Sequence, residues 1–166
     1  MTDSIEKRII LQASLDRVWQ ALTDHKEFGA WFGMKFEKPF QPGAIVRAEI
    51  VGTEVDPEVA KAQKQYQGIK FEITIDRIEP QKLFSFRWHP GAVDPTIDYS
   101  TEPTTLVAFT LKEEANAVAL TVTESGFDQI PISRRAKAFT SNDQGWGIVI
   151  HLLEKHLANA AKVQAV

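Results

Sequence analysis

Cysteine is absent from this sequence of 166 residues. The chain therefore has no disulfide, no cysteine-ligated zinc or iron–sulfur cluster, and no cysteine nucleophile. It also lacks a glycine-rich phosphate loop and the H-E-x-x-H and G-x-S-x-G motifs of metalloproteases and serine hydrolases. We predict no cofactor and no metal, and the missing nucleotide fingerprint argues against an oxidoreductase.

Long apolar segments are missing as well. No window approaches the roughly 18 consecutive apolar residues that a membrane-spanning helix needs, and residues 1–8 lack the apolar core of a signal peptide. Lys and Arg number 19 against 22 for Asp and Glu, so a formal net charge of −3 offers no general attraction to nucleic acid or anionic membranes. We expect a cytoplasmic protein that neither binds nucleic acid nor inserts into a membrane.

Hydrophobic periodicity indicates strands and helices that are segregated along the chain. A strand over 5–12 precedes two short helices, with Ser14 and Asp24 as N-caps and Gly33 as the end of the second helix. A short helix over 58–66 and a long one from Pro131 accompany strands predicted over 43–51, 69–76, 83–89, 104–112 and 118–124. This order predicts an α+β fold in which a curved antiparallel sheet wraps around the long C-terminal helix.

The long helix carries one apolar stripe with spacings of three and four residues. Its members are Ile132, Ala136, Phe139, Asp143, Trp146, Ile150, Leu153 and Leu157. Gly145 and Gly147 lie inside the helix, where each costs about 1 kcal/mol relative to alanine. We interpret them as marking either a bend or a close approach to the sheet.

Aromatic residues are numerous on the predicted inward faces, which is typical of a core. Together they are also enough to wall an apolar pocket between the sheet and the long helix. The candidate wall residues are Phe32, Phe71, Phe84, Phe86, Trp88, Phe109, Trp146 and Ile150.

Three polar residues fall in the same apolar registers. Asp143 occupies the helical stripe, where it reaches solvent, pairs with a strand residue, bends the helix or provides a polar spot in the cavity. Glu124 continues the inward register of the last strand, unless the end of that strand is exposed. Arg77 continues the inward register of 69–76 in the same way. These three are our polar cavity candidates.

The histidines do not form a metal-binding pattern. His151 and His156 are five positions apart, about 140° around a helix, and differ in this from an i, i+4 pair of ligands. His151 and Glu154 share a helical face, but two ligands are too few for a site. We interpret these residues as solvated surface side chains.

Several segments resemble a known family. They are 13–24 followed by Trp31-Phe32, the strand 83–88, the hairpin end 123–127, and Gly145-Trp146 leading into Leu152-Leu153. Their order is similar to that in SRPBCC (START-like, Bet v 1-like) domains, and most similar to the branch related to the activator of the ninety-kilodalton heat-shock chaperone ATPase.

The resemblance implies a helix-grip fold with a cavity between sheet and helix, in which apolar or amphipathic ligands bind. In some relatives it also implies chaperone contact or polyketide cyclisation. It transfers no catalytic residues. We expect a single START-like domain over 1–166, in which the resemblance covers a core at 5–158, and the sequence pattern predicts a frayed tail at 159–166. The short helical segment 56–67 and the loop 90–103 resemble insertions.

The sequence is compatible with three functions. The leading hypothesis is a non-catalytic domain that binds a small apolar or amphipathic molecule. The second is a co-chaperone-like module that contacts a chaperone through its surface. The third is a cyclase or aromatase, which requires Glu124 to form an acid–base pair with Asp143 or His89 inside the cavity. An uncovered edge strand would also allow a homodimer.

Overall fold

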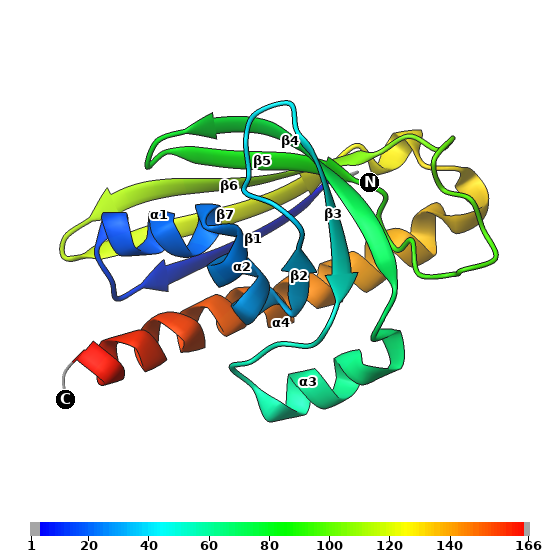
Figure 1. Cartoon of the computed structure of the whole chain (residues 1–166). Helices are drawn as coiled ribbons and strands as arrows, with labels where there is room; N and C mark the ends of the chain where they lie inside the picture. The colour runs from blue at the N-terminus through cyan, green and yellow to red at the C-terminus, as the bar shows by residue number, and fades with distance from the viewer. Residues whose placement is uncertain (1–3, 165–166) are drawn as a thin grey trace.

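A curved antiparallel sheet packs against the long helix α4 (Figure 1). Residues 4–164 are described by the computed structural model, and within them seven strands form this sheet in the order β1-β7-β6-β5-β4-β3-β2. The strands are β1 (Ile5–Leu11), β2 (Met34–Phe36), β3 (Ile45–Ile50), β4 (Lys70–Glu79), β5 (Leu83–Trp88), β6 (Thr105–Glu114) and β7 (Ala117–Ser125). The helices are α1 (Leu15–Thr23), α2 (His25–Phe32), α3 (Pro57–Gln63) and α4 (Ile132–Gln164), with 3-10 turns η1 (Lys64–Tyr66) and η2 (Phe127–Gln129). The α+β helix-grip prediction is confirmed.

The two short helices after β1 begin and end at the residues that the sequence indicates. The Ser14 hydroxyl accepts a hydrogen bond from the backbone N–H of Arg17, and the Asp24 carboxylate caps α2. Gly33 ends α2 in the left-handed conformation, with φ 98°. At Gly29 a Cβ would collide with the carbonyl oxygen of Met34, so α2 can pack onto β2 only with glycine there.

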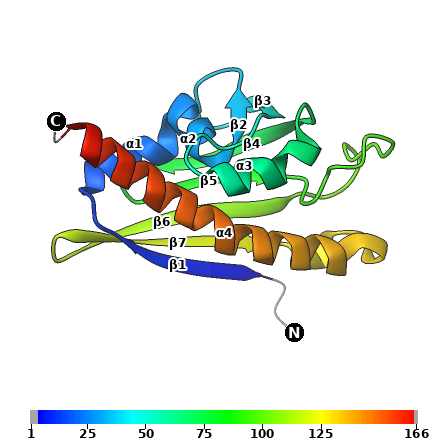
Figure 2. The same ribbon diagram turned by 90° about the horizontal axis from the view of Figure 1, so that it is seen from below.

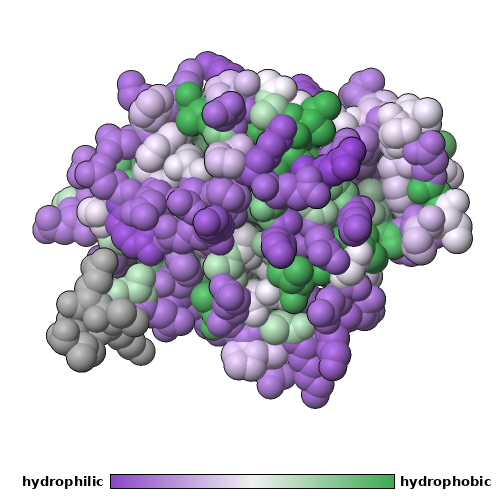
Figure 3. Space-filling model, viewed as in Figure 1, coloured by the Kyte–Doolittle hydropathy of each residue, from purple (hydrophilic) through white to green (hydrophobic). Residues whose placement is uncertain are grey.

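Helix α4 crosses the concave side of the sheet, as Figure 2 shows from below. Its residues Trp146, Ile150 and Leu153 are buried, whereas Ile148 is half-exposed, so one face of the helix meets the core. The molecular face seen in Figure 1 is mostly hydrophilic with separate hydrophobic areas, as Figure 3 shows. Most of the large aromatic residues are buried in the hydrophobic core.

Four local features differ from what the sequence indicates or were left open by it. The tail is not frayed from residue 159, because α4 continues to Gln164; residues 165–166 lie outside the described part. The strand β2 was not expected. A Cβ at Gly145 or Gly147 would meet no atom within 4 Å, so neither glycine marks a close approach to the sheet. The register of β4 shifts at a bulge between Ile75 and Arg77, which turns the later residues.

Among the described helices, none is long and apolar enough to cross a membrane.

Candidate functional site

Glu124 is a fully buried carboxylate with a relative exposure of 0%. Its oxygens accept hydrogen bonds from Trp88 Nε1 at 2.8 Å and Thr105 Oγ1 at 2.6 Å. Trp146 Nε1 donates at 2.8 Å, and Asn142 Nδ2 lies 2.9 and 3.0 Å from the two oxygens. Four side chains therefore converge on one carboxylate. We call these five residues the Glu124 cluster.

Neighbouring strands and one helix turn bring this cluster together. Trp88 ends β5, Thr105 begins β6 and pairs with Trp88, and Glu124 lies one residue before the end of β7. Asn142 and Trp146 are four positions apart on α4 and so share the face that meets the sheet. The predicted inward orientation of Glu124 agrees with this placement. Its hydrogen-bond partners Thr105 and Asn142 were not identified from the sequence.

All the hydrogen-bond partners of the Glu124 carboxylate are uncharged side chains. Within residues 4–160, whose side chains the structure describes, no Lys, Arg or His is ion-paired with Glu124. The two indole N–H groups can only donate, so each carboxylate oxygen serves as the acceptor for one of them. A buried charge without a counter-charge is costly even when its hydrogen bonds are made. The cluster therefore offers an uncompensated negative charge in the interior.

Aromatic rings adjoin the cluster on its apolar side. The rings of Trp88 and Trp146 have centroids 5.9 Å apart and planes inclined by 31°, and Phe32 lies edge-on to both at 6.3 and 5.6 Å. Phe109 contacts Trp146 at 5.8 Å, and Phe86 contacts Trp88 at 5.3 Å. The rings thus pack against one another at the polar end of the core.

The proposed wall residues do not all lie in one place. Phe32, Phe84, Phe86, Phe109, Trp146 and Ile150 are buried, and Trp88 is half-buried. Phe71 is also half-buried and contributes to a hollow of about 520 Å³ over β2, β3 and β4, whose side chains include Lys35, Arg47, Glu49 and Glu72. A second hollow, of about 470 Å³, lies along the α4 segment 136–144. Neither hollow is between the sheet and α4.

Two of the three polar candidates are at the surface instead of in the interior. Asp143 has a side chain 45% exposed and forms an ion pair with Lys7 at 3.0 Å. Arg77 is 59% exposed and pairs with Glu79, because the bulge in β4 turns its side chain outward. The prediction that these two line the cavity is therefore wrong, whereas the alternative that Asp143 pairs with a strand residue is confirmed, since Lys7 lies on β1. Asn142, one residue before Asp143, holds the interior position.

The acid–base pair that a cyclase would need does not form. Asp143 is occupied at the surface by its ion pair. His89 Nε2 lies 3.0 Å from the carbonyl oxygen of Glu102 and makes no hydrogen bond with Glu124. Within the described residues, no three His, Asp or Glu side chains gather as a metal site. The cluster is suited to binding through hydrogen bonds and charge, and it lacks a second titratable partner for proton transfer.

The loop 89–104 joins two members of the cluster, because it runs from Trp88 to Thr105. Arg134, in the first turn of α4, contacts this loop at three residues. Its guanidinium pairs with Glu102 at 2.7 Å and donates from Nη1 to the carbonyl oxygen of Pro90 at 2.8 Å. Its Cζ also lies 4.8 Å from the ring centroid of Tyr99. One side chain thus holds the loop that connects the two strand residues around Glu124.

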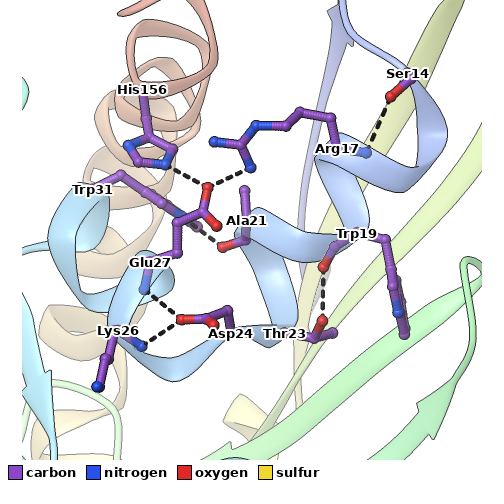
Figure 4. Close-up of polar contacts among 10 residues, drawn as sticks. All are labelled: Ser14, Arg17, Trp19, Ala21, Thr23, Asp24, Lys26, Glu27, Trp31 and His156. Atoms are coloured by element: carbon purple, nitrogen blue, oxygen red, sulfur yellow. Dashed lines mark hydrogen bonds and ion pairs between the residues drawn. The ribbon is translucent and has the colours of Figure 1, made fainter. Parts of the chain in front are cut away.

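A second polar cluster joins α1, α2 and α4 near the C-terminal end of α4 (Figure 4). Glu27 on α2 forms an ion pair with Arg17 on α1. Nε2 of His156 on α4 lies at hydrogen-bond distance from Glu27 Oε1, at 2.8 Å. His156 is only 16% exposed, so the interpretation of this residue as a solvated side chain is wrong. The contact joins positions 129 apart in the sequence, and no local pattern indicates it.

Residues 12–158 match the family model described as Activator of Hsp90 ATPase homolog 1-like protein. The chain belongs to this family. The Activator of Hsp90 ATPase homolog 1-like proteins are members of the SRPBCC superfamily, so the predicted family is confirmed. Among curated proteins, none matches the sequence closely enough to count as a relative.

Several solved protein structures are similar in fold to this chain. DynU16, a protein in the dynemicin biosynthetic locus, is 26% identical with a TM-score of 0.67, and the alignment covers 96% of this chain and 49% of DynU16. The chain thus spans about half the length of that protein. MLL2253 from Mesorhizobium loti is 19% identical, with a TM-score of 0.68 and coverages of 94% and 97%. The Aha1 dimer from Colwellia psychrerythraea is 16% identical, with a TM-score of 0.64 and coverages of 93% and 95%. These last two show the fold alone.

Proposed function

We propose that this protein is a binding domain for a small amphipathic molecule. The ligand's apolar body would lie against the aromatic rings between the sheet and α4, and its polar group would meet the carboxylate of Glu124. The observation that carries the proposal is the buried Glu124 itself, which is held by four neutral donors at the edge of an aromatic cluster. Apolar walls with a few oriented polar groups are the usual composition of small-molecule sites.

Entry of a ligand requires the aromatic rings to separate. Trp88 and Asn142 are the half-buried members of the Glu124 cluster and so lie on its solvent side. Trp88 also adjoins the loop 89–104, most of whose residues beyond Pro90 are exposed or half-exposed. Displacement of this loop and of the Trp88 ring would open the interior without disturbing the buried strands. The ligand then replaces ring–ring contacts with contacts of its own, at about 25 cal/mol per Å² of apolar area removed from water.

Ligand binding ranks ahead of the two other functions. A cyclase needs a second titratable group beside Glu124, and Asp143 and His89 are engaged elsewhere. Contact with a chaperone would use the surface of the domain, whereas the most unusual side-chain arrangement is in the interior. A homodimer stays a prediction.

The test uses Nile red, an uncharged dye that fluoresces in apolar surroundings, together with NMR signals of the indole N–H groups. We expect saturable one-to-one binding that shifts the signals of Trp88 and Trp146. The signal of Trp31 should stay in place, since its N–H donates to the carbonyl oxygen of Ala21, away from the cluster. The proposal fails if the folded protein binds neither the dye nor a small aromatic molecule with one polar group, or if binding leaves both cluster signals unchanged.

A further inference from the structure

We infer that the ligand of this domain is a cation: an ammonium group carried on an apolar, preferably aromatic, body. The inference rests on the proposed function, because it names the chemical class of the molecule bound at the Glu124 cluster. It excludes fatty acids and other amphipathic anions as ligands of the same site.

The first argument is the charge balance of the interior. Trp88, Thr105, Asn142 and Trp146 all present neutral donors to Glu124, and no cation among residues 4–160 is ion-paired with it. A ligand ammonium would supply the missing positive charge where water is excluded, and there an ion pair is stronger than in solution. A ligand carboxylate would place a second negative charge beside the first.

The second argument is the aromatic surroundings. The ring centroids of Trp88, Trp146 and Phe32 are 5.6 to 6.3 Å apart. The two indole N–H groups donate hydrogen bonds to the carboxylate of Glu124. A cation beside that carboxylate therefore lies close to electron-rich rings. Tryptophan is the strongest partner for such cation–π contacts. An anion or an uncharged alcohol makes no cation–π contact with these rings.

The third argument identifies the donor that the ligand would replace. Asn142 is the one partner placed against both carboxylate oxygens, at 2.9 and 3.0 Å, and it is half-buried on α4. An ammonium group has three donors and can occupy this bridging position in its place. Trp88, Thr105 and Trp146 can then keep their hydrogen bonds to Glu124.

The experiment compares three molecules that share an indole ring and differ only in the terminal group. Tryptamine carries an ammonium, tryptophol a hydroxyl and indoleacetate a carboxylate at neutral pH. We expect calorimetry to show tryptamine binding at least about tenfold more tightly than tryptophol, and indoleacetate more weakly than both. Equal affinities, or the tightest binding by indoleacetate, would overturn the inference.

Two variants and a control connect the preference to the cluster. Glu124→Gln should reduce the preference for tryptamine over tryptophol to about twofold or less. Asp143→Asn removes a carboxylate from the surface of the same helix and should leave the preference intact. Asn142→Ala should strengthen tryptamine binding, because the bridging position is then vacant, and this result does not depend on the stability of the Glu124 variant. A preference that survives Glu124→Gln, or that Asn142→Ala weakens, contradicts the inference.

The outcomes separate this inference from the proposed function. If Nile red binds at the cluster and the three indoles show no ammonium preference, the domain binds a ligand of another class and only the inference fails. If neither Nile red nor any indole binds, both fail.

Discussion

Replacing Glu124 with glutamine tests the structural account of the buried cluster most directly. The side chain keeps its shape, but one carboxylate oxygen becomes an NH₂ group. In one orientation of the amide, this NH₂ faces the N–H of Trp146, and in the other it faces that of Trp88. An indole nitrogen cannot accept a hydrogen bond. Either orientation therefore leaves one indole donor opposite another donor.

The hydroxyl of Thr105 decides between the two orientations. It lies 2.6 Å from Oε2, on the same side as Trp88, and it can rotate to accept a hydrogen bond from the NH₂ group. The amide nitrogen should therefore replace Oε2 and leave Trp88 without an acceptor. Trp146 should keep its hydrogen bond to the remaining oxygen.

The expected loss of stability is about 2–3 kcal/mol. A buried donor without a partner costs about 1–3 kcal/mol, and the remaining hydrogen bonds lose the contribution of a charged acceptor. Removal of a buried charge without a counter-charge offsets part of this loss. For a domain of this size, the change corresponds to a Tm lower by about 4–12 °C, and the native state persists at room temperature.

Denaturant unfolding and NMR together measure this prediction. The indole N–H signal of Trp88 should shift strongly in Glu124→Gln, and that of Trp146 weakly. In a double-mutant cycle, Trp88→Phe should cost less in the glutamine background than in the wild type, because the unpaired donor is gone. A Glu124→Gln variant as stable as the wild type, or a cycle without coupling, would refute the reasoning.

Three further predictions concern sites outside the cluster. Gly147→Ala should raise stability by about 1 kcal/mol in thermal unfolding, because a Cβ there meets no atom within 4 Å in the middle of α4; a lower Tm would show an unrecognised constraint. Arg134→Gln should speed amide hydrogen exchange in the loop 89–104 by about tenfold or more, because it removes the charged hydrogen bonds from Arg134 to this loop. The control Arg135→Gln should leave the exchange rates of the loop unchanged. The hydrogen bond from Lys155 and the backbone N–H groups of α3 hold the pKa of Asp56 below its ordinary value. The contribution of Asp56 to stability should therefore be complete above about pH 4 and lost as the pH falls through the folded-state pKa. An NMR titration of the Asp56 carboxyl group measures this pKa. An ordinary or raised value would contradict the prediction.

Helix spacing alone cannot choose between Asp143 and Asn142. From Phe139 to Trp146, steps of four then three pass through position 143, and steps of three then four pass through position 142. Both patterns fit 3.6 residues per turn. The sheet decides the matter, because α4 is rotated so that Asn142 reaches Glu124 and Asp143 reaches Lys7 on β1.

Strand registers are predictable only as long as a strand stays regular. The alternation of Val118, Leu120 and Val122 placed Glu124 correctly in the interior, since β7 is regular to its end. The same reasoning placed Arg77 incorrectly, because one bulge in β4 inverts the side chains that follow it. Nothing in the local pattern of polar and apolar residues marks that bulge.

The sequence by itself determined the element order, the helix-grip class, the caps of α1 and α2, and the inward face that contains Glu124 and Trp146. These features depend on periodicity and on short-range hydrogen bonds between near neighbours. Only the tertiary structure decided that Trp88, Thr105, Asn142 and Trp146 converge on one carboxylate, and that Glu27 joins three helices. Such contacts link positions 10 to 129 residues apart, and their geometry depends on how the sheet curves and how α4 is rotated against it.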